Sequence, residues 1–197
     1  MIISAERKQR TRKMVLGAIM TAFVIVLQSI ASMTTFFGPF SSAVALIPIV
    51  IGAAMCGTAV GTWLGIVFGA VVLLTGGANL FLPFSVQGTL ITVLVKGAAC
   101  GFMAGIVYNS LKKFNEYVAA IAAAIVCPIT NTGVFLLGCS IFFMKHDQAI
   151  AAEAGVQGTG IALFLAFAMA NFVLELVSNI LLSPIFIRVL KFAKKQN

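Results

Sequence analysis

Glycines at four-residue intervals constrain the fold of this chain more than any other feature. The two ladders that they form are Gly57, Gly61, Gly65 and Gly69, then Gly97, Gly101 and Gly105. Residues four apart share one face of an α-helix, and each ladder lies in an apolar run long enough to cross a bilayer. A glycine face lets a second helix backbone come close, and such packing drives helix association in lipid. The ladders therefore predict a compact bundle of membrane helices.

The composition predicts one membrane domain. Of the 197 residues, 61% are hydrophobic and 9% are charged, whereas a soluble domain has about 25% charged residues. Because a chain this short and apolar leaves no room for a separate soluble domain, we expect residues 1–197 to form a single all-α integral membrane domain. The formal net charge of +8 comes from residues at the ends of apolar runs, which indicates membrane topology rather than nucleic-acid binding.

Six apolar runs have lengths compatible with membrane spans, which need about 20 residues each. They cover about 13–33, 41–56, 58–76, 85–110, 117–144 and 158–190. A basic lead-in at 1–12 precedes them, and a basic tail at 191–197 follows them. The first run is longer than the roughly 7–15 residues of a signal-peptide core, so we interpret it as a span. The second run is short and contains Pro48, which predicts a tilted, kinked or partly buried helix.

The placement of lysine and arginine predicts that both termini are cytoplasmic. Eleven of the 13 basic residues fall in three segments that a six-span topology places on one side. These residues are Arg7, Lys8, Arg10, Arg12, Lys13, Lys112, Lys113, Arg188, Lys191, Lys194 and Lys195. Basic residues accumulate on the cytoplasmic side of membrane proteins. An odd number of spans would put the two basic tails on opposite sides of the membrane.

The external loops of this topology, about 34–40, 76–84 and 145–157, hold several candidate binding residues. Loops on a rigid scaffold often bind ligands, and phenylalanine rings there can either stack on a planar ligand or anchor the protein at the membrane surface. His146 is the only histidine, and a single histidine predicts no metal site. The candidate substrate-binding residues in the whole chain are Phe36, Phe37, Phe40, Asn79, Phe84, Gln87, Lys96, Asn131, Lys145 and Asn171.

Three polar residues inside the spans are further candidates for function. Lys96 and Glu175 are the two charges within apolar runs, where ionisable groups are costly unless they are paired or hydrated. We expect either a structural role, as an internal salt bridge or with Lys96 reaching toward the interface, or a role in ligand binding or coupling. Asn131 follows Pro128 in the fifth run, where the loosened helix leaves carbonyl groups to satisfy. Asn131 is therefore a candidate for ligand contact or for helix–helix packing.

The sequence lacks signatures of catalysis. It has no GxSxG nucleophile elbow, no HExxH zinc motif and no GxxxxGK[ST] phosphate-binding loop, so we expect neither an enzyme nor an ATPase. The four cysteines form no CxxC pair and are expected to pack as small apolar side chains, with no metal or cofactor. Active transport by such a chain needs an ion gradient or an energising partner. Because Glu175 is the only intramembrane acid, a partner is favoured.

Several diffuse segments together form a recognisable pattern. They are the basic lead-in to a first helix with Ala18 and Ala22 four apart, the segment 47–52 before the glycine-rich third run, and the segment 171–176 followed by Pro184 and Arg188. With six spans and both ends inside, this pattern resembles the substrate-binding S component of an energy-coupling factor (ECF) transporter over nearly the whole chain.

The resemblance implies both a function and partners. Such proteins bind a water-soluble vitamin or related micronutrient from outside, dock on a transmembrane coupling subunit that carries two ATPases, and topple in the membrane to release the ligand inward. The family's small-residue docking motif corresponds here to Gly17, Ala18, Thr21 and Ala22, for which internal helix packing is the alternative. A bacterial-type plasma membrane is the expected location of this multi-pass protein, and no nucleic-acid partner is expected.

The substrate stays open at this point. The family often has a Gly-Pro-Lys-like turn before the third span, but this chain has Gly57, Thr58 and Ala59 there. Pantothenate, folate, pyridoxine, riboflavin and deazapurine ligands are all compatible with the pattern. A self-sufficient ion-coupled secondary transporter or channel, or a small intramembrane enzyme, is the alternative class of protein.

Overall fold

The computed structural model describes residues 2–33, 45–155 and 157–195, and the regular structure in these ranges is helical. In chain order the elements are α1 (Ile2–Met33), α2 (Leu46–Cys56), α3 (Thr58–Leu74), α4 (Val86–Leu111), α5 (Glu116–Phe142), the 3-10 helix η2 (Met144–His146), α6 (Asp147–Ala154) and α7 (Ile161–Lys195). No strand occurs in the described ranges, so the all-α fold class is confirmed for them. The helix α1 begins at Ile2, so the basic lead-in is part of the first helix from that residue onward.

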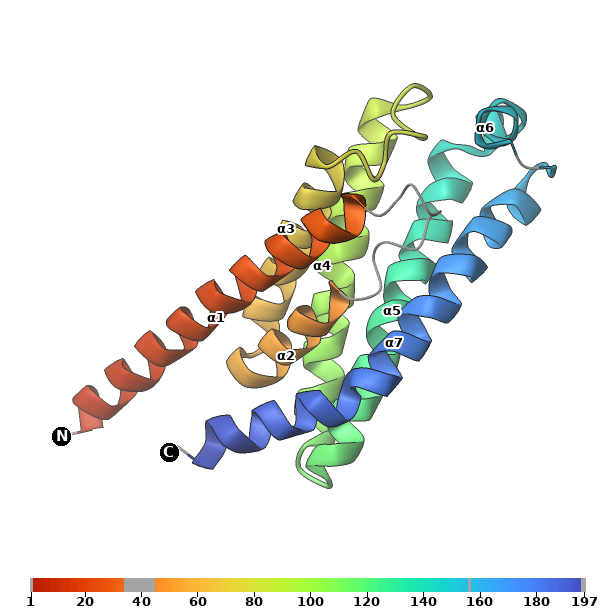
Figure 1. The fold of residues 1–197 in the computed structure, drawn as a ribbon. Helices are drawn as coiled ribbons and strands as arrows, with labels where there is room; N and C mark the ends of the chain where they lie inside the picture. Colours follow the sequence, from red (N-terminus) through yellow and green to blue (C-terminus); the bar gives the residue numbers. More distant parts are fainter. Residues whose placement is uncertain (1, 34–44, 156, 196–197) are drawn as a thin grey trace.

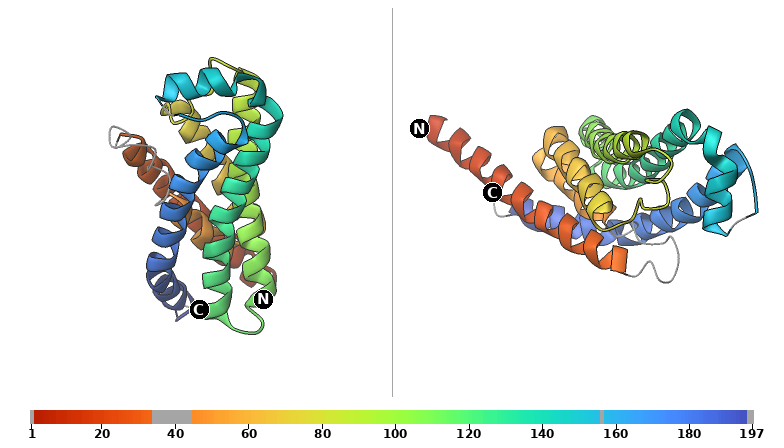
Figure 2. Two further views of the ribbon diagram at one scale, coloured as in Figure 1. Left: turned by 90° about the vertical axis from the view of Figure 1, so that its right-hand side faces the viewer. Right: turned by 90° about the horizontal axis from the view of Figure 1, so that it is seen from above.

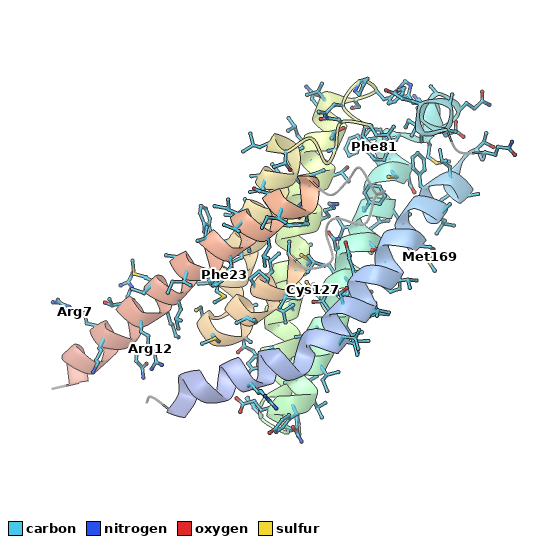
Figure 3. The ribbon with its side chains drawn as sticks, viewed as in Figure 1. Arg7, Arg12, Phe23, Phe81, Cys127 and Met169 are labelled. Carbon is cyan, nitrogen blue, oxygen red and sulfur yellow. The ribbon has the colours of Figure 1, made fainter. Side chains whose placement is uncertain are left out.

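The long helices run between two ends of the molecule, as Figures 1 and 2 show. At the lower end of Figure 1, α1 begins, α4 turns into α5, and α7 ends. The 75–85 segment and α6 lie at the opposite end. We call the lower end the basic end, because Arg7 and Arg12 lie there (Figure 3) and Lys112 and Lys113 lie in the turn between α4 and α5. We call the upper end the loop end.

The helices have the length and the surface of membrane-spanning segments. Among the described residues, three segments are long and apolar enough to cross a membrane, namely Arg7–Ser32, Val86–Leu111 and Glu116–Phe142, while α2 and α3 are shorter apolar helices. Large apolar side chains point away from the bundle, including Phe23 on α1 and Met169 on α7 (Figure 3). Such a surface suits a lipid environment, because lipid tails are as apolar as these side chains.

The two glycine ladders face each other across the α3–α4 contact. A Cβ atom added to Gly65 would overlap the Gly97 carbonyl, and one added to Gly101 would overlap the Gly61 carbonyl. No side chain larger than hydrogen fits between the two backbones at these positions. The prediction that the ladders allow close helix approach is therefore confirmed, and the structure adds that each ladder is the other's partner.

The main apolar core lies among α2, α3, α4 and α5. Its largest fully buried members include Leu46, Ile49, Leu64 and Phe68. The four cysteines are free and buried, as predicted. The helix α2 begins at Leu46, so Pro48 falls in its first turn, where its missing N–H leaves no helical hydrogen bond unmade. Residues 41–44 of the predicted second run lie outside the described residues.

The segment predicted as a loop at 145–157 contains most of η2 and the whole of α6. The short helix α6 has Asp147 in its first turn and ends at Gly155, which has a φ of 65°. Glycine adopts this left-handed conformation at little cost, so it is well suited to end a helix. The backbone N–H of Gly160 donates a hydrogen bond to Asp147 Oδ2. This contact ties the start of α6 to the residues just before α7.

Asn115 caps α5, and its removal gives a first prediction. Asn115 Oδ1 accepts hydrogen bonds from the backbone N–H groups of Tyr117, at 2.8 Å, and Val118, at 3.3 Å. We expect Asn115→Ala to lower the free energy of unfolding by about 1 kcal/mol, because these N–H groups lose their acceptor. Thermal unfolding in detergent measures the change, and Asn115→Asp, which keeps an acceptor, is the matched control. Equal destabilisation by both substitutions would contradict a capping role.

Candidate polar binding site

Three neighbouring helices each carry two residues one turn apart in the interior of the bundle. The pairs are Thr92 and Lys96 on α4, Asn131 and Phe135 on α5, and Glu175 and Asn179 on α7. The helix α5 packs against both α4 and α7. Counted from the loop end of their helices, Lys96, Asn131 and Glu175 lie 10, 11 and 14 residues deep, which is roughly 15–21 Å at 1.5 Å per residue. We call Thr92, Lys96, Asn131 and Glu175 the polar cluster.

Asn131 and Glu175 join α5 to α7 through their side chains. Asn131 Nδ2 donates to both carboxylate oxygens of Glu175, at 3.2 Å to Oε1 and 3.1 Å to Oε2. Both side chains are buried, with 4% and 2% of their surfaces exposed. Asn179 Nδ2 donates to the backbone carbonyl of Glu175 at 2.7 Å, one turn away on the same helix. The carboxylate of Glu175 is thus held by an amide from a different helix.

Lys96 contacts an aromatic ring of α5. Its Nζ lies 5.3 Å from the centroid of the Phe135 ring, an arrangement in which the negative face of the ring attracts the ammonium. Asn131, rather than Lys96, makes side-chain hydrogen bonds to the Glu175 carboxylate. The salt bridge expected between Lys96 and Glu175 is therefore replaced by an amide–carboxylate contact between α5 and α7.

Two polar atoms of the polar cluster are buried without a hydrogen-bond partner. They are Asn131 Oδ1 and Thr92 Oγ1. Thr92 lies against α5 at Gly138, where an added Cβ would overlap the threonine side chain. An unpartnered buried acceptor costs about 1–3 kcal/mol. Native structures leave few such groups unsatisfied, and a ligand is one partner that would satisfy them.

An aromatic cap, formed by Phe81, Phe84 and Phe143, covers the loop end of the cluster. The Phe81 ring, from the segment between α3 and α4, packs edge-on to Phe135 at 5.7 Å and lies 5.1 Å from Phe143. Figure 3 shows Phe81 beside the upper part of α5. Phe84 lies 5.8 Å from the His146 ring, so η2 and the 75–85 segment meet there. The cap therefore contacts the same Phe135 ring that holds Lys96.

The structure brings together two of the predicted binding residues and separates others from them. Lys96 and Asn131 belong to the polar cluster, and Phe84 belongs to the cap. Three more are exposed outside the cluster, namely Asn79, Gln87 and Lys145. Phe36, Phe37 and Phe40 lie outside the described residues, as does the side chain of Asn171.

Sequence reasoning left Thr92 and Phe135 unassigned and treated Phe81 only as one of the outer-loop phenylalanines. It flagged Glu175 without placing it among the binding residues. The available signal was the spacing of four residues between polar or aromatic side chains in the fourth, fifth and sixth runs. Such spacing places both members of a pair on one helix face. It does not reveal which faces meet, because contacts between helices far apart in sequence depend on their packing.

The predicted docking residues on α1 divide into two sets. Ala18 and Ala22 are exposed. Gly17 is buried, with its Cα near Val60 of α3, since an added Cβ would lie 3.3 Å from Val60 Cγ1. Thr21 is partly buried, and its hydroxyl donates to the Gly17 carbonyl at 2.8 Å. The outward-facing small residues of α1 are therefore Ala18 and Ala22.

The polar cluster is suited to binding. It offers an ammonium, a carboxylate, an amide oxygen and a hydroxyl in an apolar surrounding, where hydrogen bonds are strong. Among the described residues, no group of three or more histidine, cysteine, aspartate or glutamate side chains could hold a metal ion. The family model of the ECF transporter substrate-specific component matches residues 12–188. The chain belongs to this family. Comparisons with curated proteins and with solved structures gave no match.

Membership assigns this S component a general role. It is a substrate-binding subunit of a membrane transporter, and its family consists of binding subunits rather than enzymes. The family implies a small-molecule substrate and association with a membrane coupling subunit and ATPases. The apolar helices and the family together indicate a multi-pass membrane protein.

Proposed function

We propose that this S component captures a water-soluble vitamin or related micronutrient in the polar cluster for uptake across a bacterial plasma membrane. The proposal includes one domain over residues 1–197, six spans, and both termini in the cytoplasm. The observation that carries it is the pair of buried, unpartnered polar atoms, Asn131 Oδ1 and Thr92 Oγ1, on the two helices that also carry the contact between Lys96 and Phe135. A polar ligand would satisfy atoms that the chain itself leaves without partners.

Energy for uptake comes, in this proposal, from a separate coupling subunit with two ATPases. Ala18 and Ala22 would form its docking face on α1, because two small exposed side chains four residues apart let another helix approach. The loop end would face outward, since the basic residues gather at the opposite end.

Identification of the bound molecule tests the function. The S component is purified from cells grown in rich medium, and small molecules released by denaturation are identified by mass spectrometry. We expect one micronutrient in near-stoichiometric amount with the wild-type protein. Recovery of none, together with uptake by the protein alone in liposomes under an ion gradient, would overturn the proposal.

Bulky substitutions on α1 test the docking face separately. We expect Ala18→Trp and Ala22→Trp to abolish uptake in cells that express the coupling subunit and ATPases, because an indole on either position blocks close helix approach. Ligand binding by the purified variants should be unchanged, since both residues are exposed and lie on a different helix from the polar cluster. Met169→Trp, at an exposed position on α7, is the matched control. Normal uptake in both Ala18→Trp and Ala22→Trp would exclude this face of α1 as the docking face.

A further inference from the structure

We propose that the polar cluster selects an anionic ligand that also donates a hydrogen bond from an N–H or O–H group, such as a carboxylate or phosphate with an amide, ureido, ring N–H or hydroxyl donor. This inference rests on the function proposed above and names the class of its substrate. It follows from the orientation of one amide and the placement of one ammonium.

The orientation of the Asn131 amide is set by Glu175. Because Nδ2 donates to both oxygens of the carboxylate, the carbonyl side of the amide points away from Glu175. Asn131 Oδ1 is buried and has no hydrogen-bond partner. An amide oxygen can only accept, so the matching ligand group is a donor. Glu175 is therefore a positioning residue, which determines that the cluster presents an acceptor rather than a donor at this point.

The placement of Lys96 selects the charge of the ligand. Its ammonium lies over the Phe135 ring, 5.3 Å from the ring centroid. A carboxylate or phosphate on the ligand would give Lys96 a charge-assisted hydrogen bond, which is shorter and stronger than a neutral one. An uncharged ligand would leave the ammonium without that partner, and a cationic ligand would be repelled by it.

The negative charge and the hydrogen-bond donor belong to one ligand, because Lys96 and Asn131 both lie next to Phe135 at the contact between α4 and α5. Lys96 contacts Phe135, and Phe135 lies one turn from Asn131 on α5. One turn corresponds to roughly 6 Å along the helix. A molecule with a few bonds between its acidic group and its hydrogen-bond donor can therefore engage Lys96 and Asn131 together.

A panel of probes tests the class of ligand. Calorimetric titration of the full-length protein in nanodiscs compares pantothenate, biotin and folate, which are anions with N–H donors, with uncharged riboflavin and pyridoxine and cationic thiamine. We expect the tightest binder to be one of the three anions, by at least tenfold. A tighter riboflavin, pyridoxine or thiamine overturns this inference and leaves the proposed function intact. If no probe binds, the co-purified molecule is judged by the same two criteria. The absence of any bound molecule overturns this inference, whereas the proposed function is overturned only if the protein alone also takes up substrate in liposomes.

A second measurement tests the role of Asn131 and Glu175. The tightest anionic probe is compared with analogues in which each of its N–H or O–H donors is methylated in turn. We expect the wild-type protein to prefer the unmethylated probe by about tenfold or more at one of these donors, and Asn131→Leu and Glu175→Gln each to reduce that preference toward unity. Gel filtration confirms folding of both variants, and the wild-type preference is informative even if a variant fails to fold. No preference in the wild-type protein, or an unchanged preference in both folded variants, would overturn the assignment.

Discussion

Lys96→Met is expected to weaken ligand binding by about two to three orders of magnitude. Lys96 is the only lysine of α4, its side chain is partly buried, and its ammonium contacts the Phe135 ring. Loss of one partner from a buried charge-assisted contact costs about 2–5 kcal/mol, and each 1.4 kcal/mol corresponds to about tenfold in affinity. Calorimetric titration in nanodiscs, with the co-purified molecule or the tightest probe, measures the change.

Two control variants separate the charge of Lys96 from its packing. Lys96→Arg keeps the positive charge and is expected to retain more affinity than Lys96→Met. Lys113→Met removes a lysine exposed in the turn at the basic end and should leave affinity unchanged. Methionine matches the length and apolar stem of lysine, so the packing against Phe135 is largely kept. Wild-type affinity in Lys96→Met would show that the ligand does not use this charge.

Substitution of Gly65 is expected to have the largest effect on stability. An added Cβ would overlap the Gly97 carbonyl and lie 2.6 Å from the carbonyl carbon, so the backbones of α3 and α4 must separate. Overpacking of a tight interior costs about 1–3 kcal/mol. We expect Gly65→Ala to lower the unfolding free energy by about that amount, and Gly65→Leu to prevent recovery of a monodisperse protein. Thermal unfolding and gel filtration in detergent measure both effects.

Gly133 provides a matched control for Gly65. It also lies within an apolar helix, but it is exposed, and an added Cβ meets no other atom within 4 Å. Gly133→Ala should therefore leave stability unchanged or raise it, because alanine favours the helical conformation by about 1 kcal/mol over glycine. Equal losses of stability in Gly65→Ala and Gly133→Ala would contradict this explanation. They would show that the close approach of the α3 and α4 backbones is not what makes glycine necessary at position 65.

Most of the helices could be predicted from the sequence. Runs of apolar residues gave segments close to α3, α4 and α5, because a bilayer of fixed thickness demands helices of similar length. The helix α6 was not predicted, because an alanine-rich stretch of eight residues carries little hydrophobic signal. Its end depends on Gly155 in a left-handed conformation, and its start is tied by the contact between Asp147 and Gly160.

The candidate site was predictable only in part. Lys96, Asn131 and Glu175 stand out because polar groups in apolar runs are costly. Their relation was not evident: Asn131 and Glu175 are 44 residues apart in sequence and share two hydrogen bonds. The exposed positions of Asn79, Gln87 and Lys145 were equally hidden, because neither a loop sequence nor the first turn of a helix indicates which side chains turn toward the bundle.

The sequence by itself determined that this chain is a helical membrane protein of the ECF substrate-binding type, and that glycine faces would bring helices together. These properties follow from composition and from spacing along one helix. Only the tertiary structure decided that the two ladders face each other, that Glu175 holds the amide of Asn131, and that Lys96 rests on Phe135. The physical reason is that lipid and the bundle interior are equally apolar, so hydrophobicity alone does not fix the rotation of each helix about its axis.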